Sequence, residues 1–133
     1  MKKENEHLNL KLDREKRIEA EKKRINKLYK DFPKSKRDFL DGLISSSAFL
    51  KVHLEDMQND LLKNGMFEIF EQGSQRFERE RPQTKTYSTY IQKYAGVQKQ
   101  LIDILPSEVQ KKETNDLAKF MQKGNSIRCK THT

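Results

Sequence analysis

The segment from Phe39 to Gly65 constrains the fold of this chain more than any other, because it is the longest stretch with helical apolar periodicity. Its main stripe recurs at steps of three and four residues, which places the side chains on one side of an α-helix. Asn64-Gly65 predicts the end of the helix, because glycine readily adopts the left-handed conformation found at helix C-termini. The stripe consists of Leu40, Leu43, Ser47, Leu50, Leu54, Met57 and Leu61.

Other apolar residues of the same segment fall outside this stripe. One interpretation is a core helix of a small bundle. The other is a helix whose second apolar face meets a further partner, such as another copy of the chain. On the second interpretation the predicted oligomer interface is formed by Ile44, Phe49, Val52 and Leu62.

The charge is unevenly distributed along the 133 residues, whose formal net charge is +8. Residues 1–40 carry 14 Lys and Arg against 8 Asp and Glu, residues 41–105 carry 8 against 9, and residues 106–133 carry 6 against 3. Two basic ends therefore flank a nearly neutral middle, which favours an anionic partner. With 33% hydrophobic and 36% charged residues, the chain is too polar for all of it to enter one core.

These patterns predict a mainly α fold with three parts. Residues 1–34 form a basic N-terminal helical arm, frayed up to about residue 12 and helical over 13–29. Residues 35–106 form a long antiparallel helical hairpin that serves as the oligomerisation core. Residues 107–133 form a flexible, polar, basic tail with one short amphipathic helix carrying Val109, Leu117, Phe120 and Met121, and with residues 124–133 disordered.

Two connections separate the predicted helices. Pro33 breaks the first helix, and Ser35 with Asp38 resembles a capping box that opens the second. Residues 66–81 are interpreted as a short β-hairpin or an extended loop, with Gly73 supplying a positive φ. The third helix, over 82–106, carries an apolar and tyrosine stripe and packs against the second.

Basic residues cluster in the N-terminal arm and in the 66–81 connection. A solvated helix whose charges maintain solubility is one interpretation, and a surface that binds DNA phosphates is the other. In the connection, a simple link between helices and a loop directed at DNA both remain open, with Arg81 as a further contact. The DNA-binding candidates are Lys16, Lys22, Lys23, Arg24, Lys27, Lys30, Lys34, Lys36, Arg37, Arg76 and Arg79.

No catalytic or metal-binding motif is present in the sequence. There is no GxxxxGK[ST], GxSxG, HExxH or CxxC pattern, and Cys129 with His132 supplies only two candidate zinc ligands. The prediction is a protein that is not an enzyme and has no cofactor, metal or small-molecule substrate. A lone cysteine and the lack of a long apolar run or signal peptide predict a location in the cytoplasm of the cell that makes the protein, away from membranes.

The sequence SSSAFLKVHLEDMQNDLLKNG, then FEIFEQGSQ, Pro82, Tyr87, Tyr94 and the closing LIDILP resemble the small terminase subunits of tailed phages and prophages. The resemblance covers residues 35–106. It implies a homo-oligomer, typically a ring, that binds double-stranded viral DNA. It also implies a partner, the large terminase subunit, which holds the ATPase and nuclease of the packaging motor. The competing hypothesis is a helical interaction module, such as a phage assembly chaperone or regulator, without specific DNA binding.

Overall fold

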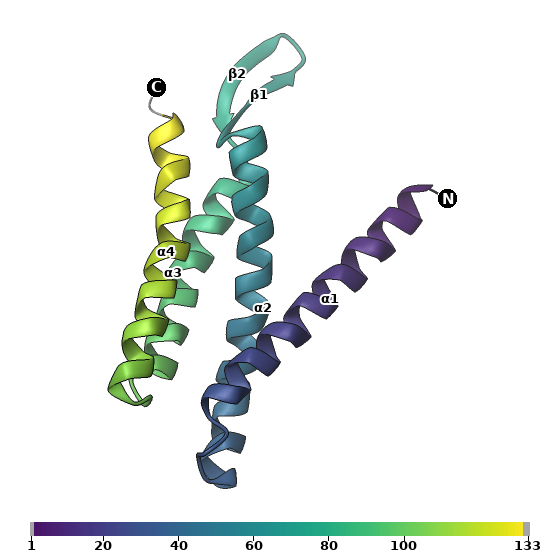
Figure 1. Cartoon of the computed structure of the whole chain (residues 1–133). Helices are drawn as coiled ribbons and strands as arrows, with labels where there is room; N and C mark the ends of the chain where they lie inside the picture. The colour runs from purple at the N-terminus through teal and green to yellow at the C-terminus, as the bar shows by residue number, and fades with distance from the viewer. Residues whose placement is uncertain (1, 132–133) are drawn as a thin grey trace.

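The computed structural model describes residues 2–131, with side chains through Lys123, as four helices and one two-stranded sheet. In chain order the elements are α1 (Lys2–Leu28), α2 (Lys34–Asn64), β1 (Phe67–Gln72), β2 (Gln75–Glu80), α3 (Pro82–Ile102) and α4 (Ser107–Thr131). Helices α2, α3 and α4 lie side by side, α1 crosses α2, and the sheet projects beyond the end of α2 (Figure 1). The predicted mainly α fold is confirmed.

The predicted helical hairpin is formed by α2 and α3, which run in opposite directions (Figure 1). Ile44, near the start of α2, packs in one cluster with Leu101, near the end of α3. Leu54, further along α2, packs with Ile91, nearer the start of α3. Helix α2 ends at the predicted glycine, because Gly65 has a φ of 81° and its N–H donates a 2.9 Å hydrogen bond to Leu61 O.

The connection between these helices is an antiparallel β-hairpin, which decides between the two alternatives for residues 66–81. Phe70 pairs with Phe77 across the strands, and Gln72 pairs with Gln75 next to the turn. Gly73 in that turn has a φ of 61°, in the left-handed region that favours glycine.

The core consists of two apolar clusters along the α2–α3 hairpin. One contains Tyr29, the residue after α1, and lies where α1 crosses α2. The Tyr29 hydroxyl donates a 2.5 Å hydrogen bond to Leu101 O. Burial, followed by the negative charge of Glu113, raises the pKa of Tyr29 to about 12. The other cluster contains Leu54 and is covered by α4. A buried hydrogen bond from Gln98 to Ser47 lies between the two clusters along the hairpin.

Helix α1 covers part of the second apolar face of α2, and this overturns half of the predicted oligomer interface. Ile44 and Val52 are only 2% and 3% exposed within the single chain, because they pack beneath α1. Phe49 and Leu62 are 52% and 39% exposed. The second partner of α2 is therefore, in large part, a helix of its own chain.

Two predicted boundaries near the N-terminus are wrong. Residues 2–12 are helical, not frayed, since Glu- and Lys-rich sequence continues a helix nucleated by the contacts further along. Their end of α1 points away from the other helices (Figure 1). Helix α2 begins at Lys34 with Pro33 at its N-cap and without a side-chain capping bond, so Ser35 does not form the expected capping box.

The prediction of a flexible tail is also corrected, because residues 107–131 form α4. The four apolar residues proposed for a short helix pack against the core clusters, and this contact extends the helix beyond the length that propensity alone would favour. Residues 132 and 133 lie outside the described residues.

Candidate nucleic-acid interface

Helix α1 has two faces of opposite character. Ile18, Ile25 and Tyr29 follow one another at steps of seven and four, and this face packs on α2. Lys16 and Lys23 belong to the other face. At 100° per residue, Lys23 lies about 160° around the helix from Ile25, so it points into solvent.

We call Lys16, Lys23 and Lys27 the lysine stripe. They recur at the same steps of seven and four, and all three are exposed. The stripe spans about 16 Å along the helix axis. In the part of the chain with described side chains, none of the three belongs to an ion pair.

Four more predicted cations follow the stripe along the chain, through the turn and into the first residues of α2. Each is exposed and none is in an ion pair within residues 2–123: Lys30, Lys34, Lys36 and Arg37. The first turn of α2 has no acidic residue. Cations at this end of a helix oppose the helix dipole, so a bound anion would relieve the repulsion.

Two predicted DNA contacts face inward. Lys22 lies 3.4 Å from Glu19 and lines a surface hollow against α2. Arg24 lies 2.7 Å from Glu21 and 3.2 Å from Glu113. Adjacent residues of a helix are rotated by 100°, so residues 22–24 cannot all point to one partner.

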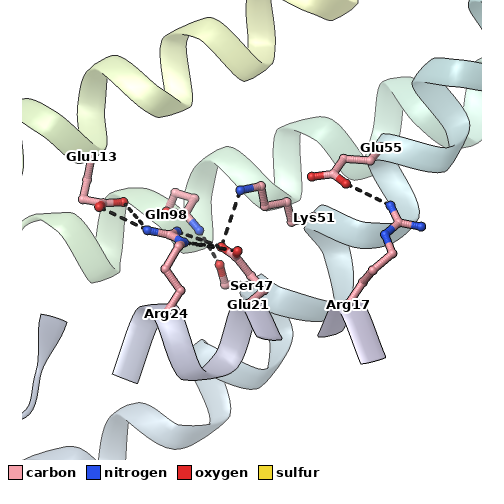
Figure 2. Close-up of polar contacts among 8 residues, drawn as sticks. All are labelled: Arg17, Glu21, Arg24, Ser47, Lys51, Glu55, Gln98 and Glu113. Atoms are coloured by element: carbon pink, nitrogen blue, oxygen red, sulfur yellow. Dashed lines mark hydrogen bonds and ion pairs between the residues drawn. The ribbon is translucent and has the colours of Figure 1, made fainter. Parts of the chain in front are cut away.

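Arg24 belongs to a polar cluster that joins three helices (Figure 2). Glu21 of α1 also lies 3.6 Å from Lys51 of α2. Glu113 of α4 is the most buried member, with its side chain 7% exposed. The hydrogen bond to Glu21 raises the pKa of the Arg24 guanidinium, against the opposing effect of burial.

Glu113 was not among the predicted site residues, although its position in the sequence indicates a buried charge. It lies four residues after Val109 and four before Leu117, so it occupies the apolar stripe of α4. A carboxylate at such a position needs a buried cation.

A second cluster, also missed, joins the middle of α1 to α2. Arg14 and Arg17 contact Asp56 at 2.8 and 2.9 Å, and Arg17 also contacts Glu55 at 2.9 Å. Burial alone would raise the pKa of Asp56, but the hydrogen bonds from the two arginines outweigh it and lower the pKa. Two arginines of the basic arm therefore hold α1 on α2.

The arginines of the β-hairpin are also neutralised locally. Arg76 lies 3.2 Å from Glu71, and Arg79 lies 2.7 Å from Glu68 with its guanidinium 3.8 Å from the centre of the Phe70 ring. Residues 67–80 contain four glutamates and two arginines, a net charge of −2. This charge disfavours the hairpin as a DNA contact.

Arg81 anchors the base of the hairpin. It donates hydrogen bonds of 2.8 Å to Asp60 and 2.7 Å to Gly65 O.

Among the residues with described side chains, no group of three or more His, Cys, Asp and Glu could hold a metal ion. Cys129 and His132 lie outside those residues. Over the described residues, the search for a helix with the length and apolar character to cross a membrane found none.

No protein-family model matches the chain, and searches of curated proteins and of solved structures found no match.

Proposed function

We propose that this chain is a DNA-binding adaptor of the small terminase kind, without catalytic activity of its own. It binds double-stranded viral DNA and recruits the large ATPase–nuclease subunit of the packaging motor. The lysine stripe is the observation that supports DNA binding most strongly. The likeness of residues 35–106 to small terminase subunits supports the more specific role.

The three stripe lysines form no ion pair within the described side chains and are exposed. The arginines of α1 with ion pairs, such as Arg17 and Arg24, hold that helix against the others. The stripe lysines instead repel one another on an open surface. Such a surface favours a polyanion, whose phosphates are held by lysines with little dependence on base sequence.

The stripe and the start of α2 offer cations on adjoining parts of the chain. Lys30 lies in the turn between them, and Lys34 begins α2. Duplex DNA carries about one charge per 1.7 Å of its axis, so a 16 Å stripe can face several phosphates. The exposed Phe49 and Leu62 remain candidates for contacts between subunits of an assembly.

The test is charge reversal with a matched control. The triple variant with Lys16→Glu, Lys23→Glu and Lys27→Glu should no longer bind duplex DNA at ~100 mM salt, as measured by the fluorescence anisotropy of labelled DNA. The control reverses Lys85, Lys99 and Lys119, which are also exposed and lie on α3 and α4. It should bind as the wild type does. Equal binding by both triple variants would contradict the assignment of the stripe.

The competing function is a helical interaction module without specific DNA binding. The acidic β-hairpin favours it, because its two arginines are neutralised and its apolar residues are exposed. The same anisotropy measurement separates the two functions: an interaction module would leave duplex DNA unbound even in the wild type.

A further inference from the structure

One face of the β-hairpin combines exposed apolar residues with exposed carboxylates. Phe67 pairs with Glu80 and Ile69 with Glu78, so these four side chains share one side of the sheet. Phe67 and Ile69 are 50% and 58% exposed. The two glutamates form no ion pair among the described side chains. We call these four residues the hairpin face.

The opposite end of α2 has an apolar groove of ≈ 500 Å³. Phe39 lines it and is 82% exposed, and Ile104 on the α3 side is 45% exposed. Lys36 is the charged residue of its lining, and no carboxylate lines it. The complete lining of this foot groove is Phe32, Ser35, Lys36, Phe39, Leu40, Leu43, Gln100 and Ile104.

The two surfaces complement each other in charge and in apolar spacing. Phe67 and Ile69 lie about 7 Å apart along their strand. Phe39 and Leu43 lie about 6 Å apart along α2. Glu78 and Glu80 of the hairpin face would meet Lys36, which has no ion pair in the part of the chain with described side chains.

We propose that the occupant of the foot groove is the hairpin face of a second copy of this chain. From Phe39 to the end of α2 the helix rises about 37 Å, so one chain cannot close the contact on itself. The contact is therefore heterologous and leads to a closed ring or an open chain of subunits. This inference rests on the proposed function, because the contact between hairpin face and foot groove would hold the subunits of the proposed oligomer together. The contact leaves the lysine stripe free for DNA.

A heterologous contact makes a specific prediction for mixed variants. Phe39→Asp removes the groove and keeps the hairpin face, whereas Ile69→Asp does the reverse. Each variant alone should be monomeric by light scattering after size exclusion, from micromolar to submillimolar concentration. The equimolar mixture should give a complex of two chains, in which the intact hairpin face of one variant binds the intact groove of the other. Nothing larger should form, because the second groove and the second hairpin face each carry Asp.

The control is Leu10→Asp, the same change at a residue of α1 that is 52% exposed and belongs to neither surface. It should keep the wild-type mass. A wild-type chain that is monomeric throughout would overturn the proposal, as would a mixture that stays monomeric. Loss of the assembly in Leu10→Asp would overturn it too. Far-UV circular dichroism confirms folding of each variant, and both mutated positions are mostly exposed.

Charge exchange provides a second test. Lys36→Glu and Glu78→Lys should each weaken the assembly, and the two together in one chain should restore it. DNA binding is measured on every variant. A monomeric wild type that binds DNA through the lysine stripe overturns this inference alone, whereas an assembly that ignores DNA overturns the proposed function alone.

Discussion

Glu113 shows how one buried side chain links the C-terminal helix to the basic arm. Its carboxylate lies 3.2 Å from Arg24 and its side chain is 7% exposed. Glu113→Gln should lower the free energy of unfolding by about 2 kcal/mol, because it removes the charge that compensates Arg24. The value is modest because the Arg24 side chain is 41% exposed and water screens it. Urea unfolding of the wild type and of Glu113→Gln measures this difference in the free energy of unfolding.

The matched control for that change is Glu108→Gln, in the first turn of the same helix on an exposed side chain. It should alter stability by no more than about 0.5 kcal/mol. If the two substitutions had equal effects, the buried ion pair would not hold α4 in place.

His53 predicts a pH dependence. Burial, and then the positive charge of Arg14, lower its pKa in the folded chain. The unfolded chain has an ordinary histidine pKa of about 6.5, so below that pH it binds more protons than the folded chain does. Stability should therefore fall as the pH drops from about 7 to 5, and His53→Gln should flatten this fall. His7→Gln, on the exposed end of α1, should leave it unchanged; a slope unaffected by His53→Gln would contradict the account.

At the scale of elements, the sequence predicted best where a pattern was local. The α2 stripe, the end at Gly65 and the turn at Gly73 follow from periodicity and backbone preference. Packing between segments far apart in the sequence could not be predicted from local patterns. No residue pattern within α1 or α2 indicates that α1 covers Ile44. The docking of α4 was missed for the same reason.

The β-hairpin should be dispensable for folding. Replacing residues 67–80 with a short Gly-Ser linker should change the free energy of unfolding by less than about 1 kcal/mol, since neither core cluster contains a hairpin residue. Arg81→Ala should cost more, about 1–2 kcal/mol, because it removes the ion pair with Asp60 and the hydrogen bond to the Gly65 carbonyl. Thermal unfolding compares the two, and a larger loss from the linker would contradict this division.

At the scale of the whole molecule, function depends on which charges remain available. The sequence identified the basic arm, but it could not separate arginines with internal partners from exposed lysines. Arg24 and Lys23 are neighbours, but they point about 100° apart around α1, and only Arg24 has an internal partner. The planar guanidinium suits fixed ion pairs, which explains why the arginines of α1 mark its packing side. The resulting molecule has a basic arm that crosses α2 and an acidic hairpin beyond the end of α2 (Figure 1).

The measurement that tests the central claim most directly is the salt dependence of duplex DNA binding. The logarithm of the binding constant should fall linearly with the logarithm of salt concentration, and replacing Lys16, Lys23 and Lys27 with Gln should reduce the slope by about 2–3. The same change at Lys85, Lys99 and Lys119 should leave the slope as in the wild type. A slope that the first triple variant does not alter, or a wild type that does not bind duplex DNA, would contradict the account.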